Sequence, residues 1–186
     1  MNRTSTLHST SLFLSVCLLS GCRGMSSAPP DPAGTSILEA LRNAEYPIDV
    51  VRSGKVQLKD GFFEETVVPG SAIKTRISLG KQQVTGDLNG DGAQDAAVTV
   101  VANLGGTGTF TYLAAVGNRD GAAEPIASVF LGDRIAVSSL VIESGKIHVT
   151  VLTRKPGEAM VARPTVEVKR KFKLQGDLLV EENGKH

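Results

Sequence analysis

The sequence has few residues of the types on which histidine-based active sites and aromatic binding platforms depend. Among its 186 residues are three histidines, two tyrosines and no tryptophan. A Ser-His-Asp triad or a histidine-ligated zinc site would have few members to draw on, and the lack of tryptophan disfavours a carbohydrate site built by ring stacking. Its 20 basic and 19 acidic side chains nearly cancel, so the chain offers no general attraction to nucleic acid.

Long hydrophobic runs are also missing, and the apolar stretch at residues 12–19 is too short to cross a bilayer. It follows residues 1–11, which carry one cation, Arg3, and no acid. This order is typical of the charged region and apolar core of a secretion signal. We therefore expect residues 1–21 to be a signal peptide and the protein to be exported.

The apolar stretch ends in Leu19-Ser20-Gly21-Cys22, which resembles the bacterial lipobox. The resemblance implies that Cys22 is lipid-modified and becomes the first residue of the mature chain; an ordinary cleavage site that contains a cysteine is the alternative. Because Cys17 would leave with the signal, Cys22 would be the only remaining thiol and no intramolecular disulfide could form. Residues 22–34 are small, polar and proline-rich, which predicts a flexible linker.

Residues 35–186 suffice for one domain with its own core. A helix is expected near the start, with Thr35 or Ser36 as N-cap, Ile37, Leu38 and Leu41 on one face, and its end at Tyr46-Pro47. The rest has the pattern of strands, with turn residues between three pairs of them: 56–59 and 62–66 around Asp60-Gly61, 136–142 and 146–152 around Ser144-Gly145, and 165–174 and 178–181 around residues 175–177.

Residues 96–102 are nearly all apolar, which predicts a central strand covered on both faces, with the helix on one side. Residues 110–116 are expected to pair with this strand in a hairpin with a glycine-rich tip. Such local connections imply antiparallel pairing. The predicted fold is a single α+β domain, predominantly antiparallel β-sheet with one N-terminal helix.

The segment just before residues 96–102 has the pattern of a cation-binding loop. Side-chain oxygens stand at its first, third, fifth and ninth positions, with glycine, Gly92, at the sixth. Calcium takes six to eight oxygen ligands, and the candidates here are the side chains of Asp87, Asn89, Asp91 and Asp95 and the carbonyl of Ala93. The alternative is a metal-free turn rich in Asp and Asn, but three nearby carboxylates repel one another without a cation. We therefore expect calcium, in a structural role; magnesium fits less well because it keeps its waters and demands rigid octahedral geometry.

The loop is not an EF-hand, because Val98 stands where a bidentate glutamate should close the shell. The spacing D-x-N-x-D-G-x-x-D before an apolar strand instead resembles the loops of FG-GAP and VCBS-type repeats and the first half of a dockerin loop. In those families calcium is held by the side chains that match Asp87, Asn89, Asp91 and Asp95 and by the main-chain oxygen that matches Ala93. Propellers of such repeats need several copies. A single copy implies the ion site and not the propeller.

A wider resemblance covers most of the domain. Besides the loop, the segments that carry it are ALRNA at 40–44, VQLKDG at 56–61, GTGTF at 106–110, YLAAV at 112–116 and VFLGDR at 129–134. Together they resemble a group of uncharacterised bacterial exported proteins and lipoproteins with a single loop of this type. Some members carry cysteines ahead of a Pro-Thr or Pro-Ser pair where this chain has residues 161–165 without cysteine, so no thiol chemistry is carried over. No activity comes with the resemblance.

Outside the loop, alternation in residues 166–174 places Lys169, Lys171 and Lys173 on one strand face. Such a row usually marks a solvated strand or an edge strand protected against aggregation, and the alternative is contact with anionic lipid, a cell-wall polymer or another polyanion. His148 is expected to be a solvated strand residue, and Asp133-Arg134 a local ion pair or turn element.

Together these features predict a lipid-anchored, noncatalytic binding or assembly module of the bacterial cell envelope. Its expected partners are a membrane, through the anchor, and an envelope protein or cell-wall polymer, but not nucleic acid. The expected location is the outer membrane or a periplasm-facing membrane, and Arg23 after the anchor fits outer-membrane sorting in systems where an aspartate at that position retains the protein inside. The alternative is a secreted or envelope hydrolase with a site near the calcium loop, which a cleft holding Asp133, Glu143 or His148 beside the loop would support.

Overall fold

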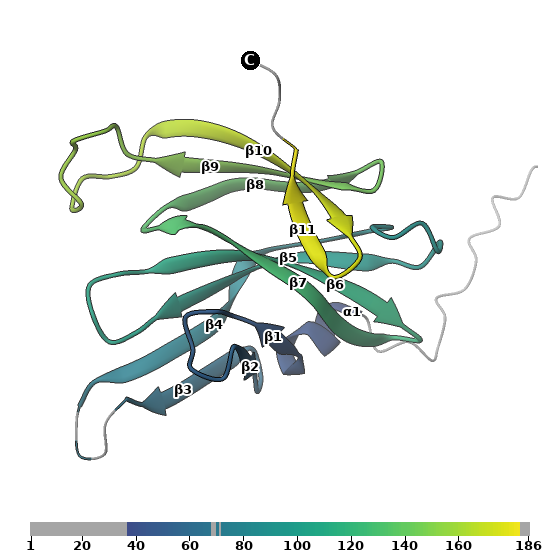
Figure 1. The fold of residues 1–186 in the computed structure, drawn as a ribbon, viewed down its shortest axis with the longest axis horizontal. Coiled ribbons are helices and arrows are strands. Elements are labelled where there is room, and N and C mark those ends of the chain that lie inside the picture. The colour runs from purple at the N-terminus through teal and green to yellow at the C-terminus, as the bar shows by residue number, and fades with distance from the viewer. Residues whose placement is uncertain (1–36, 68–69, 71, 183–186) are drawn as a thin grey trace, which may run out of the picture. The chain divides into compact units, whose positions relative to one another are not determined.

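The computed structural model describes residues 37–67, 70 and 72–182, and within them nearly all regular structure is antiparallel β-sheet (Figure 1). The predicted signal peptide and linker, and the N-cap candidates Thr35 and Ser36, lie outside the described residues. The elements are α1 (Ile37–Ala40), the 3-10 turn η1 (Leu41–Asn43), β1 (Glu45–Pro47), β2 (Lys55–Gln57), β3 (Phe62–Thr66), β4 (Lys74–Gly86), β5 (Asp95–Asn103), β6 (Phe110–Arg119), β7 (Ala122–Asp133), β8 (Ala136–Glu143), β9 (Lys146–Thr153), β10 (Val166–Gln175) and β11 (Leu178–Glu181).

The strands form a five-stranded sheet in the order β3-β4-β5-β6-β7, a four-stranded sheet in the order β11-β10-β9-β8, and the small pair β1-β2. Every pair is antiparallel, and in the two larger sheets sequential neighbours are also spatial neighbours, as short connections require. The prediction of a predominantly antiparallel sheet is confirmed. None of the described helices has the length and apolar composition needed to cross a membrane.

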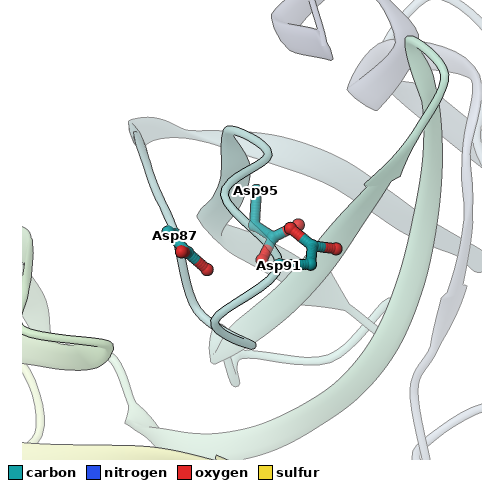
Figure 2. Close-up of side chains that lie close together, drawn as sticks. All are labelled: Asp87, Asp91 and Asp95. Atoms are coloured by element: carbon teal, nitrogen blue, oxygen red, sulfur yellow. The ribbon is translucent and has the colours of Figure 1, made fainter.

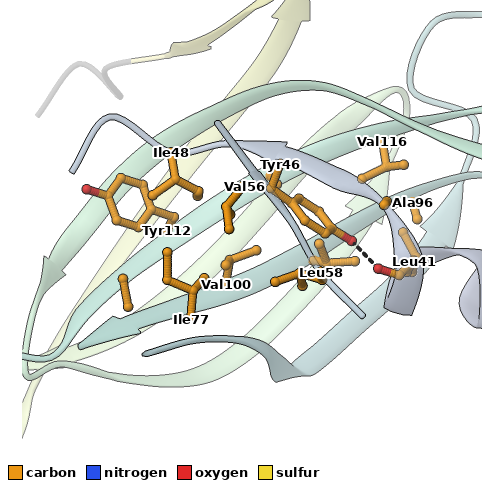
Figure 3. Close-up of a cluster of buried hydrophobic side chains, with 14 of the residues drawn as sticks. Leu41, Tyr46, Ile48, Val56, Leu58, Ile77, Ala96, Val100, Tyr112 and Val116 are labelled. Atoms are coloured by element: carbon orange, nitrogen blue, oxygen red, sulfur yellow. Dashed lines mark hydrogen bonds between the residues drawn. The ribbon is translucent and has the colours of Figure 1, made fainter. Parts of the chain in front are cut away.

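Strand β5 is the middle strand of the larger sheet and is covered on both faces, as predicted. One face, with Val98 and Val100, packs against α1, β1 and β2 in a core that includes Tyr46 (Figure 3). The other face, with Ala97, packs with the four-stranded sheet, whose Phe172 is completely buried. The near-continuous apolar sequence of β5 follows from this burial on both sides.

The N-terminal helix is much shorter than predicted, and Tyr46-Pro47 belongs to strand β1 rather than to the helix end. Ile37 and Leu41 are buried, but Leu38 is 40% exposed and does not share their face. The Tyr46 hydroxyl is buried and donates a hydrogen bond of 2.9 Å to the carbonyl of Leu41 (Figure 3). This bond gives a carbonyl at the helix end a partner, and the chain can turn directly into β1.

The turn at Asp60-Gly61 is as predicted, but the hairpin around it is not. Both residues have positive φ, 53° and 82°, and Lys59 and Phe62 exchange two backbone hydrogen bonds across them. Beyond that bridge the strands separate, because β2 pairs with β1 and β3 pairs with β4. The side chains of Val56 and Leu58 are buried around Tyr46, so core packing overrides the local hairpin. The predicted hairpins β8–β9 and β10–β11 are both present.

Candidate metal centre

The predicted cation loop connects β4 to β5, the central strand of the larger sheet. Gly90 and Gly92 have φ of 86° and 84°, a conformation that glycine adopts without steric cost. Gly86, just before the loop, packs so tightly against β8 that an added Cβ would lie 2.7 Å from Ile142. The sheet therefore holds the start of the loop beside the β8–β9 turn.

The loop brings the carboxylates of Asp87, Asp91 and Asp95 together (Figure 2). One oxygen from each lies within 4.8 Å of the others. Calcium–oxygen distances are about 2.3–2.6 Å, so oxygens on opposite sides of one ion are roughly 5 Å apart. The three carboxylates are therefore close enough to one another to ligate a single divalent cation.

Asp95 anchors the loop to the sheet. It is fully buried, and its two oxygens accept hydrogen bonds of 3.0 Å from the backbone amides of Leu88 and Asn118. The Asn118 side chain in turn donates to the carbonyl of Gln94 at 3.1 Å. Asn118 lies at the end of β6, too far along the chain for the spacing of the loop to indicate its role.

Asp87 and Asp91 are oriented by the loop's own backbone. The two oxygens of Asp87 accept from the amides of Gly90 and Gly92 at 2.6 and 3.1 Å. Asp91 accepts from the amide of Ala93 at 2.7 Å and from the side-chain amide of Asn89 at 2.8 Å. The Ala93 amide first, and then Asn89, lowers the pKa of Asp91. Asp91 is therefore held in its charged form, which is the form a cation requires.

The other two predicted ligands, the side chain of Asn89 and the carbonyl of Ala93, accept hydrogen bonds within the loop. The side-chain oxygen of Asn89 accepts from the amide of Asp91 at 2.8 Å, and the carbonyl of Ala93 accepts from the amide of Asp95 at 3.2 Å. A carbonyl oxygen has two lone pairs, so each could still face a cation. The donor set as a whole is oxygen only, which suits a hard divalent ion.

An open cleft of about 490 Å³ lies beside the loop, lined by Gly86, Asp87, Gly90, Ile142, Ser144 and Gly145. Asp133, Glu143 and His148 are not among these lining residues. Asp133 accepts from the Thr109 amide and pairs with Arg134, which lowers its pKa, so it acts as a turn element. Glu143 lies 4.0 Å from His148, with the Glu143 side chain 75% exposed.

The predicted lysine row lies on one face of β10, opposite Thr150, His148 and Lys146 of β9. Acidic side chains accompany it: Glu167 lies 3.6 Å from Lys169, and Glu182 lies 3.8 Å from Lys171 and 2.9 Å from Lys146. Lys146, and then Lys171 and Lys173, lowers the pKa of Glu182. These acids offset part of the positive charge, and polyanion contact remains a prediction.

Comparison with known proteins found no matching family model, no matching curated protein and no matching solved structure.

Proposed function

We propose that this protein is a lipid-anchored, noncatalytic binding or assembly component of the bacterial cell envelope, whose domain is stabilised by calcium at the loop of residues 87–95. The observation that carries the calcium proposal is the convergence of Asp87, Asp91 and Asp95 within 4.8 Å at the entry to the central strand. A bound divalent cation would remove the repulsion among them.

The position of the loop supports a structural role for the ion. Asp95 is part of β5 and accepts a hydrogen bond from the Asn118 amide of β6. A cation bound to Asp95 would therefore stabilise the sheet directly. Extracellular modules bind calcium with dissociation constants of about 10⁻⁴–10⁻³ M. At a concentration of about 100 times that constant, binding would add about 2.7 kcal/mol to the free energy of unfolding.

For the fold we propose a single α+β domain that starts near residue 35, after the signal peptide and the linker. It is supported by the described residues from 37 to 182, which cluster in one compact unit, and by α1, which packs on one face of the larger sheet. The anchor proposal is supported by the sequence pattern that ends in Cys22. Its expected partners are a membrane and an envelope protein or wall polymer.

Amide NMR shifts test the metal site most locally. Titration of ¹⁵N-labelled protein with calcium is expected to shift the amides of Gly90 and Gly92 saturably, with magnesium at least tenfold weaker. Asp91→Asn removes one carboxylate and is expected to abolish saturation. Asp60→Asn changes an exposed aspartate in the β2–β3 turn and serves as the matched control. Equal responses of both variants would refute the assignment.

The hydrolase alternative is favoured by one observation, the cleft beside the loop with Ser144 and Asp87 among its lining residues, and it lacks the support that Asp133, Glu143 or His148 in that cleft would give. It predicts calcium-dependent hydrolysis of ester or phosphodiester reporters that is lost in Ser144→Ala. If calcium protects the fold while reporters remain intact, the noncatalytic proposal stands.

A further inference from the structure

A second cleft, of about 270 Å³, is built from parts of the chain that are far apart in sequence. It lies among the segment between β1 and β2, strands β6 and β7, and the β10–β11 turn. The lining residues that matter here are Asp49, Tyr112, Ile126, Phe130, Asp177 and Leu178. Because these segments meet only in the folded protein, the cleft is a property of the tertiary structure.

One side of this cleft is apolar and partly open to solvent. Phe130 is 43% exposed and Leu178 is 62% exposed. The Phe130 ring is held by other aromatic rings, with its centroid 5.5 Å from that of Tyr112 and 6.2 Å from that of Phe110. An aromatic face fixed in this way can contact an aliphatic chain or a cation without losing side-chain freedom on binding.

The charged groups that line the cleft are all carboxylates, those of Asp49 and Asp177. One oxygen of Asp49 accepts a hydrogen bond of 2.6 Å from the Tyr112 hydroxyl. Burial first, and then Asp49, raises the pKa of Tyr112, so the phenol stays protonated and keeps this carboxylate in place. In the described part of the chain neither aspartate forms a salt bridge, and Asp177 has no hydrogen-bond partner.

We propose that this cleft binds a small organic cation, with an ammonium or guanidinium group that faces Asp49 and Asp177 and an aliphatic stem on Phe130 and Leu178. Ligand sites of this kind combine apolar walls with a few placed polar groups. A carboxylate beside an aromatic face selects a cation with an apolar body. A hard metal ion is not expected here, because calcium takes six to eight oxygen ligands and one side of the cleft is apolar.

The test is an NMR titration of ¹⁵N-labelled protein with hexylammonium, in chelator so that the cation loop plays no part. We expect saturable shifts at the amides of Ser128 and Leu178. Hexanol and hexanoate have the same chain without the positive charge, and their affinities are expected to be at least tenfold weaker. Asp177→Asn should raise the dissociation constant at least threefold, whereas Asp120→Asn, an exposed aspartate in the β6–β7 turn outside the lining, should leave it unchanged.

Absence of saturable shifts up to tens of millimolar hexylammonium would overturn the proposal. Equal binding of hexanol would also overturn it, since the cleft would then be merely apolar. Asp91→Asn is expected to bind hexylammonium normally, so failure of the calcium site and failure of this cleft are separable results.

Discussion

The buried carboxylate of Asp95 accepts a hydrogen bond from the backbone amide of Asn118, a residue at the end of the neighbouring strand. The same carboxylate accepts from Leu88 inside the loop. One side chain therefore ties the candidate metal loop to two strands of the larger sheet. This arrangement separates two roles: Asp95 holds the loop with or without an ion, whereas Asp91 is exposed and bonded only within the loop.

The first prediction follows from this difference. Asp95→Ala removes the acceptor of the buried Leu88 amide and of the partly buried Asn118 amide, and an unsatisfied buried group costs about 1–3 kcal/mol. We expect urea denaturation in chelator to show a loss of about 2–5 kcal/mol for Asp95→Ala. Asp91→Ala is expected to lose much less under the same conditions. Similar losses in the two variants would contradict separate roles.

The second prediction concerns the contact between the loop and β8. Gly86→Ala would place a methyl group 2.7 Å from Ile142 Cγ2 and 3.0 Å from its Cβ. Overpacking of this kind typically costs about 1–3 kcal/mol. Thermal unfolding should show a double variant with Ile142→Ala to be less destabilised than the two single effects added together, because the Cγ2 clash is removed. Strict additivity would mean that the two residues do not touch.

The third prediction is the pH dependence of stability. Arg170, through a two-pronged contact with Glu181, lowers the pKa of that carboxyl below its ordinary 4.5. A carboxyl whose pKa is lower in the folded state than in the unfolded state stabilises the protein at pH values above its ordinary pKa. This stabilisation is lost as the pH falls through the folded-state pKa. Lys74, and then Arg76, acts in the same direction on Glu64.

Urea midpoints measured from pH 7 to pH 3 are therefore expected to stay level at first and to fall once the pH drops below about 4.5. Glu181→Gln should flatten part of this fall. A variant whose pH profile matches that of the parent protein would show that the Arg170 pair adds nothing to stability.

The fourth prediction tests the lysine row. Replacing Lys169, Lys171 and Lys173 together with glutamine should change the free energy of unfolding by less than about 1 kcal/mol, since the ion pairs of Lys169 and Lys171 are at the surface. If the row contacts polyanions, the parent protein will sediment with anionic vesicles at low salt and the triple variant will not. If the triple variant binds vesicles as well as the parent protein does, and salt does not weaken the binding, this row has no role in it.

The fifth prediction concerns Cys22. If it carries the anchor, Cys22→Ser should move the protein from the membrane fraction to the soluble fraction of the producing cells, and mass spectrometry should find acyl chains on the parent protein alone. Membrane association that survives the substitution would contradict lipidation at this residue.

The two-residue turns could be predicted from the sequence because each depends on neighbouring residues, whereas the length of the N-terminal helix was predicted wrongly. Positive φ at Ser144-Gly145 sets a two-residue turn, and the apolar run of β5 reflects burial on both faces. The pairing of β2 with β1 could not be read, because it depends on the burial of Tyr46 among distant side chains. In the same way, loop spacing identified Asp87, Asp91 and Asp95, but it contained no sign of Asn118.

Thermal melting with calcium and with chelator is the most direct test of the central claim. We predict that saturating calcium raises the melting temperature of the parent protein by roughly 5–10 °C, that magnesium does so weakly, and that Asp91→Asn abolishes the rise while Asp60→Asn keeps it. A parent protein that melts at the same temperature in calcium and in chelator would contradict the account.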